Sequence, residues 1–238
     1  MSALLYGIAL QWKLDIRNKG ILLTYYIVPL VFFVFMGGIF TSIEPEANQT
    51  IIQSMTVFGV TMGAYLGTPA PLVELYSSEI KKAYKVGGIP LWTAALNNAV
   101  SGFIHLFIMS MVIYFAAPFV FNAVVPIYPS IYVMNLSLFI AASVSVGTIL
   151  GLFVKSSSKL TMFSQFIFLP SIMLSGILFS GELLPDILVY AGKIFPSTWG
   201  YLNMCKNVFN LLSMLPLAGI MITATVISIW KIRHLKNE

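Results

Sequence analysis

The chain has 238 residues, of which 58% are hydrophobic and only 9% are charged, with a formal net charge of +5. An ordinary soluble domain carries about 25% charged residues, so this much apolar surface cannot be hidden in a folded core and must face lipid. The single cysteine, Cys205, excludes an internal disulfide and a cysteine-based metal cluster. Composition therefore predicts an integral membrane protein. Its positive charge does not indicate nucleic-acid binding, because no exposed basic domain is present.

Residues 1–19 predict a helix that lies in the membrane interface. Apolar side chains such as Leu5, Trp12 and Ile16 recur at helical spacing, while Lys13 falls elsewhere on the helix. This pattern is typical of an amphipathic interfacial helix. The stretch is interrupted by polar residues and lacks a small-residue cleavage site, so we expect no signal peptide.

Six apolar stretches follow, and none has a lysine or arginine in its interior. Each is long enough to supply the ~20 residues that a membrane-spanning helix needs. We therefore predict an all-α membrane protein with a single transmembrane domain over 1–238. Its six spans are expected at 21–40, 51–76, 92–117, 131–154, 160–180 and 213–230.

Two connecting segments predict structure of their own. Segment 77–88 is short and basic, and Gly87-Gly88 and Pro90 separate it from the third span. Segment 182–201 is partly apolar but is broken by proline and glycine, so it cannot cross the bilayer. We expect two short helices there, forming an external re-entrant hairpin that is buried against protein.

The distribution of basic residues predicts the orientation. When six spans alternate sides, all thirteen lysines and arginines except Lys193 and Lys206 fall on the side of the N-terminus. Short cytoplasmic loops carry such an excess. We therefore expect a multi-pass protein of the cytoplasmic membrane with both termini inside.

The chemistry missing from the sequence limits the function classes. These 238 residues contain no GxxxxGK[ST] loop for ATP phosphates and no HExxH motif, and two histidines are too few for a typical zinc site. In or near the predicted spans we find two ionisable residues, His105 and Glu74. An ion-coupled carrier generally uses more such groups at membrane depth. We expect no catalytic residue and no cofactor in this chain. An ion-coupled secondary carrier and a membrane-embedded lipid-modifying enzyme using His105 are the alternatives.

Two stretches resemble a known family, the membrane subunits of type 2 ABC exporters (ABC-2 type permeases). Segment 174–201 is similar to that family's fifth helix and external hairpin, and its matching residues are Ser175, Gly176, Leu184, Pro185, Pro196, Thr198 and Trp199. Segment 74–92 is similar to the family's cytoplasmic coupling helix. There Glu79 and Pro90 match best, and Lys81-Lys82 replaces a common Gly-Thr.

The resemblance implies a permease subunit that works as a homodimer, or with a related paralogue, on a pair of ABC ATPase subunits that bind ATP and Mg. The coupling helix is then expected to contact the ATPase through Ser78, Glu79, Lys81, Lys82, Tyr84, Lys85 and Val86. Aromatic and methionine side chains suit a hydrophobic or amphipathic cargo such as a peptide, a drug or a lipid-like molecule. The candidates for lining its path are Tyr25, Tyr26, Phe32, Phe33, Phe163, Phe166, Met173 and Phe179.

Overall fold

The computed structural model describes residues 3–77, 80–178, 184–206 and 210–237. Within these ranges every regular element is a helix. The prediction of an all-α protein is therefore confirmed.

Four helical segments of the described chain are long and apolar enough to cross a membrane, each with at least 25 residues. The first runs over Lys19–Ile43 and comprises α2 (Lys19–Leu22), the π-helix η1 (Leu23–Ile27) and α3 (Val28–Ile43). The others are α7 (Leu91–Phe121), α8 (Pro129–Phe153) and the Leu211–Leu235 part of α12 (Leu211–Asn237). The protein is thus a multi-pass membrane protein.

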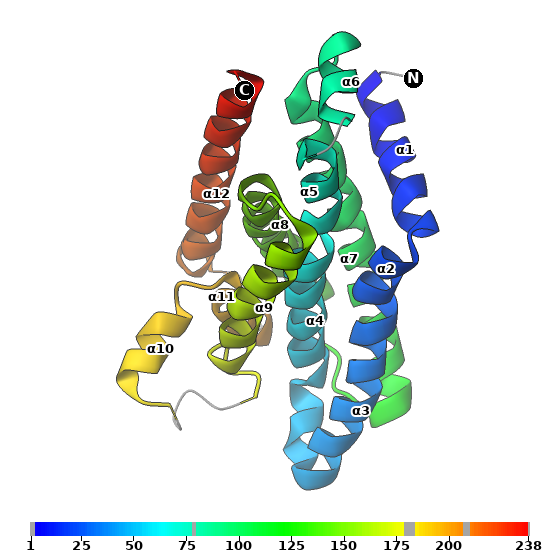
Figure 1. The fold of residues 1–238 in the computed structure, drawn as a ribbon. Coiled ribbons are helices and arrows are strands. Elements are labelled where there is room, and N and C mark those ends of the chain that lie inside the picture. Colours follow the sequence, from blue (N-terminus) through cyan, green and yellow to red (C-terminus); the bar gives the residue numbers. More distant parts are fainter. Residues whose placement is uncertain (1–2, 78–79, 179–183, 207–209, 238) are drawn as a thin grey trace.

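The two remaining predicted spans are interrupted or shorter. Residues 51–77 form α4 (Ile51–Met62), a second π-helix η3 (Gly63–Gly67) and α5 (Pro69–Ser77). These three follow one another along a single column (Figure 1). The fifth stretch forms α9 (Ser157–Met173), which ends shortly before Gly176, where the backbone turns with φ +90°.

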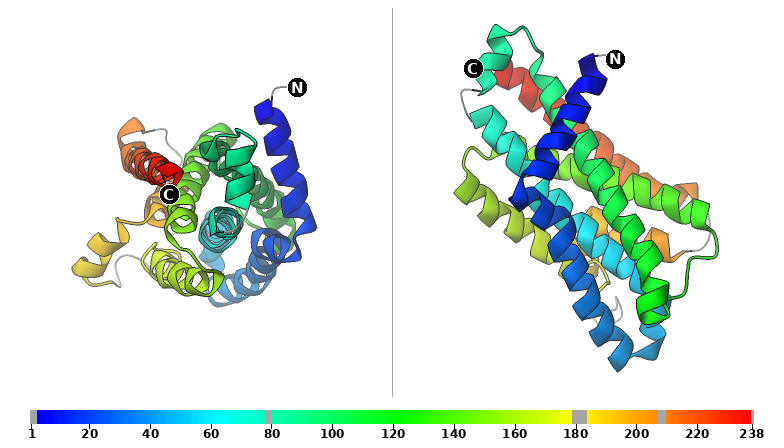
Figure 2. Two further views of the ribbon diagram at one scale, coloured as in Figure 1. Left: turned by 45° about the horizontal axis from the view of Figure 1, so that its top comes forward. Right: turned by 90° about the vertical axis from the view of Figure 1, so that its right-hand side faces the viewer.

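The α4–η3–α5 column lies at the centre of the bundle, as the view along the helices shows (Figure 2). Nearly every residue of α4 is buried, because helices surround it on all sides. On one side α8 packs against α5 and η3 and, on its other face, against α12. This central column contacts α3, α7, α8, α9 and α11.

The structure also contains shorter helical elements. They are α1 (Ala3–Arg17), the 3-10 turn η2 (Pro45–Gln49), α6 (Ile80–Val86), α10 (Asp186–Gly192) and α11 (Pro196–Cys205). The N-terminal end of α1, the whole of α6 and the C-terminal end of α12 lie at the same end of the molecule (Figure 1). The elements expected to contact a cytoplasmic partner are therefore close to both termini.

Candidate functional site

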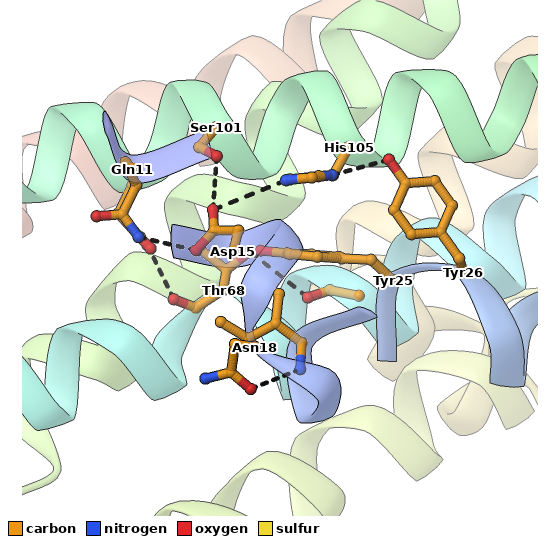
Figure 3. Close-up of polar contacts among 11 residues, drawn as sticks. Gln11, Asp15, Asn18, Tyr25, Tyr26, Thr68, Ser101 and His105 are labelled. Carbon is orange, nitrogen blue, oxygen red and sulfur yellow. Dashed lines mark hydrogen bonds and ion pairs between the residues drawn. The ribbon is translucent and has the colours of Figure 1, made fainter. Parts of the chain in front are cut away.

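The N-terminal helix α1 is attached to α7 through one buried acidic side chain. Asp15 is only 2% exposed, although its helix runs along the outside of the bundle (Figure 2). Its carboxylate accepts a hydrogen bond from Ser101 Oγ on α7 at 2.5 Å. It accepts a second one from Gln11 Nε2, one turn earlier on α1, at 2.8 Å (Figure 3). Hydrogen bonds to a charged acceptor are about twice as strong as neutral ones.

His105 lies one turn beyond Ser101 on the same face of α7 and is fully buried. Its Nδ1 shares a hydrogen bond of 2.8 Å with the hydroxyl of Tyr26, while Nε2 lies 3.8 Å from Asp15 Oδ2 (Figure 3). The Trp12 ring stacks on the imidazole with a centroid distance of 4.0 Å, and the Tyr25 ring stacks on it at 5.2 Å. Side chains from α1 and η1 thus enclose the imidazole.

A π-helix positions the two tyrosines. Tyr25 and Tyr26 are consecutive residues of η1, and they reach different partners. The Tyr25 hydroxyl lies 3.2 Å from Thr68 Oγ1, directly after the second π-helix, and Asn98 Nδ2 of α7 donates to the Thr68 carbonyl at 2.9 Å. Such π-turns inside α-helices occur frequently at functional sites. The cluster therefore joins α1, the first span, the central column and α7.

The electrostatic balance of this cluster is unusual. Burial raises the pKa of the Asp15 carboxyl above its ordinary value, and the hydrogen bonds from Ser101 and Gln11 oppose that rise. The cations of α1, Lys13 and Arg17, are exposed to solvent. Among the groups that the structure describes around the carboxylate, His105 is the one that can become a cation in contact with it.

The predicted coupling segment contains α6, and the C-terminal end of α6 is fixed by backbone hydrogen bonds. Gly88 adopts the left-handed conformation with φ +66°, and the Ile89 amide donates to the Tyr84 carbonyl at 2.9 Å. This is the hydrogen-bonding pattern of a glycine-terminated helix. The hydroxyl of Tyr76, at the end of α5, donates to the Leu91 carbonyl at 2.6 Å. These hydrogen bonds fix the C-terminal end of α6 and join α5 to the start of α7.

The predicted ATPase contacts lie in different environments. Lys82 and Val86 are exposed, and Val86 is 90% exposed, whereas Lys81 is half-buried. Tyr84 is also half-buried and packs on the apolar cluster at the base of α6. Lys85 belongs to α6, while Ser78 and Glu79 lie outside the described residues.

The residues of the hairpin motif connect two short helices to α9. Ser175 Oγ donates to the Ile172 carbonyl at 2.7 Å, next to Gly176 with its left-handed backbone. Pro185 precedes α10, and Pro196 is the first residue of α11. Thr198 Oγ1 donates to the carbonyl of the last α10 residue at 2.6 Å. The motif therefore fixes α10 and α11 against the end of α9.

The candidate path residues that the structure describes differ in their exposure. Tyr25 and Phe33 are buried, while Tyr26 and Phe32 are half-buried and face other parts of the bundle. On α9, three candidates point outward, and these are Phe163, Phe166 and Met173. Phe179 lies outside the described residues. A cavity of about 850 Å³ lies instead between the start of α7 and the end of α12, and it is lined by none of these candidates.

Sequence reasoning did not single out Asp15 or its contact with His105. The two residues are 90 positions apart, and only the packing of α1 on α7 brings them together. One signal was present, because Gln11 and Asp15 are spaced four residues apart and therefore lie on the same face of a helix. That face carries Trp12 as well, and it is the face turned toward the bundle.

The helical bundle with its four long apolar segments defines a multi-pass membrane protein. A family comparison makes this specific: residues 4–209 match the model of the ABC-2 type transporter family. The chain belongs to that family, and the resemblance seen in the sequence is confirmed. No curated protein matches the chain. ABC-2 permeases lack an ATPase domain and typically pair with an ABC ATPase, and the chain is a membrane permease subunit of this transporter type.

Proposed function

We propose that this protein is the membrane-spanning subunit of an ATP-binding cassette exporter. It moves a hydrophobic or amphipathic cargo (a peptide, a drug or a lipid-like molecule) out of the cell, using ATP that a separate subunit binds with Mg and hydrolyses. The observation that carries this proposal is the match to the ABC-2 type transporter family over residues 4–209. The position of α6, at the same end as both termini, supports it (Figure 1).

The proposed topology has six crossings with both termini in the cytoplasm. The α4–η3–α5 column extends along the bundle beside the four long spans (Figure 1). With α9 it brings the number of crossings to six, an even number that agrees with termini at one end. The excess of lysine and arginine on that side favours the cytoplasm. Residues 182–201 then lie outside as the hairpin.

The contacts support a route by which an ATPase could move the membrane helices. Helix α6 is connected to α7 by a four-residue linker, and the hydrogen bond from Tyr76 to Leu91 joins α5 to the start of α7. The hydrogen bond from Ser101 to Asp15 joins α7 to α1. A displacement of α6 would therefore reach α5, α7 and α1 together. Packed elements with hydrogen-bonded contacts transmit such shifts because they are not freely deformable.

The proposed ATPase contact comprises the exposed part of α6 with the residues just before it, Ser78 and Glu79. The basic side chains Lys81, Lys82 and Lys85 alternate with apolar ones, which suits docking of a short amphipathic helix in a groove. A second membrane subunit, either another copy or a related paralogue, completes the transporter in this proposal.

The cargo path is proposed along the seam between the two membrane subunits. The outward-facing side of α9, with Phe163, Phe166 and Met173, offers an apolar surface for that seam. Buried candidates such as Tyr25 and Phe33 would become accessible when the first span moves away from the central column and from α7.

The proposal is tested by purifying the tagged protein from its host in mild detergent and identifying the bound proteins by mass spectrometry. We expect a soluble protein with a P-loop in stoichiometric amount. Val86→Asp should remove it, because the substitution places a charge in the proposed ATPase contact. Val86 is 90% exposed, so the change should not disturb internal packing. Ile127→Asp is the matched control, a 69% exposed apolar residue between α7 and α8.

Two results would contradict the proposal. A chain that purifies without any P-loop protein, while other membrane complexes stay intact, would argue against an ABC transporter subunit. Transport that follows an ion gradient and persists without nucleotide would instead support the ion-coupled carrier.

A further inference from the structure

The contact between α1 and α7 contains a carboxyl and an imidazole group that lie close together. Asp15 is 2% exposed and His105 is not exposed at all. Nε2 of His105 is buried without a hydrogen-bond partner and lies 3.8 Å from Asp15 Oδ2. In a membrane protein, buried ionisable groups of this kind are expensive to maintain and usually serve a function.

The groups around this pair leave its charge unbalanced. From α1 the pair is contacted by Gln11 and Trp12, from α7 by Ser101 and from η1 by Tyr25 and Tyr26, all of which are uncharged at neutral pH. The basic side chains of α1 and α2 are exposed, and these are Lys13, Arg17 and Lys19. The central column contributes Thr68, which is also uncharged. An ionised Asp15 beside a neutral His105 therefore places a net negative charge at a buried contact.

We propose that Asp15 and His105 form a proton-binding site that controls how firmly α1 is held against α7. Binding of one proton makes the pair electrically neutral, as a carboxylate beside an imidazolium. Losing that proton leaves an uncompensated buried carboxylate, which is costly. Because the two groups are so close, they titrate together as one unit.

The direction of the pH dependence follows from linkage. In the attached state the Asp15 carboxylate lies 3.8 Å from Nε2 of His105 and favours the imidazolium, and this attraction is lost when α1 is detached and Asp15 is hydrated. Attachment is therefore strongest at low pH and weakens as the pH rises through the titration of the buried pair. Since the N-terminal end of α1 lies at the same end as α6, release of α1 would make the coupling end of the transporter sensitive to pH (Figure 1).

The molecule carries its own reporter of this proton. The indole of Trp12 stacks on the His105 ring at 4.0 Å with an interplanar angle of 5°. An imidazolium stacked on an indole interacts with its π-system and quenches its fluorescence, whereas the neutral imidazole does so much less. Fluorescence of Trp12 should therefore report directly on protonation of the pair.

The experiment uses the full chain in detergent or lipid nanodiscs, with Trp92, Trp199 and Trp230 replaced by phenylalanine so that only Trp12 emits. Emission is recorded across roughly pH 5 to 9, and acrylamide quenching at each pH measures the exposure of Trp12. We expect one pH step, with brighter and more quenchable emission on its alkaline side.

Three variants separate the proton site from a general pH effect. The step should disappear in His105→Gln and remain in His234→Gln, the matched control at an exposed histidine near the C-terminus. In Asp15→Asn, which can still accept hydrogen bonds from Ser101 and Gln11, the step should move by about 1 to 3 pH units toward acid because the neighbouring negative charge is gone.

A pH step that is absent in the parent, or that has the same midpoint in Asp15→Asn, would overturn the proposal. If His105→Gln fails to fold, the Asp15→Asn comparison still decides it, because that variant keeps the imidazole. The measurement needs neither ATPase nor cargo. Its failure would therefore leave the proposed exporter function untouched, and its success would not depend on that function.

Discussion

Replacing Gly151 by alanine should destabilise the bundle at the contact between α8 and α5. An added Cβ would lie 2.7 Å from the Leu72 Cβ and 2.9 Å from the Pro69 carbonyl oxygen. Carbon atoms pack at about 3.5 to 4.0 Å, so α8 and α5 would have to separate by about 1 Å. One of the obstructing atoms belongs to the backbone and cannot rotate away. Overpacking in a filled core costs about 1 to 3 kcal/mol, and we expect the upper end.

Gly219→Ala on α12 is the matched control, because no heavy atom lies within 4 Å of its added Cβ. Both substitutions gain about the same helix propensity, so the difference between them isolates the steric overlap. A difference of about 3 kcal/mol corresponds to about 6 to 12 °C in melting temperature for a chain of this size. The assay is the thermal loss of the monodisperse peak of detergent-solubilised protein. Equal melting temperatures for Gly151→Ala and Gly219→Ala would refute the reasoning.

Three further predictions concern single hydrogen bonds. Tyr76→Phe removes the hydroxyl that joins α5 to the first turn of α7 and should lower stability by about 1 kcal/mol, measured as a fall in melting temperature. Thr198→Val should loosen α10 by a similar amount and increase its hydrogen exchange, whereas Thr223→Val, at an exposed bond within α12, should leave α10 unchanged. Ser101→Ala removes a hydrogen bond that lowers the pKa of Asp15, so the pKa of Asp15 should rise further. Acrylamide quenching of Trp12 should then increase at alkaline pH. Unchanged quenching would contradict the role of Ser101 in holding α1 against α7.

The sequence predicted the parts of the fold that depend on local composition. Long apolar runs without lysine or arginine gave α7, α8 and α12, because a chain in lipid must satisfy its backbone hydrogen bonds within a helix. The hairpin motif also pointed to the family, which the match over residues 4–209 confirms. Such features are read from neighbouring residues and need no knowledge of packing.

The interruption of the second stretch was less accessible to sequence reasoning. Its hydropathy is continuous, yet the helix changes to a π-turn over Gly63–Gly67 and restarts at Pro69. The wider turn leaves room for the Tyr25 ring, which lies against Gly63 and Gly67. A tertiary contact with the first span accompanies this backbone geometry, and apolar periodicity does not record such contacts.

Residue types and local spacing are sufficient to predict that this protein lies in a membrane, that it is helical and that it belongs to its family. The tertiary structure alone decided which polar side chains meet. Asp15 appeared to be one more polar interruption in an interfacial helix, but packing turns it inward to Ser101 and His105, from 86 and 90 positions away. Hydrogen bonds and charges act over a few ångströms in space, so their partners are set by how the helices pack and not by their order along the chain.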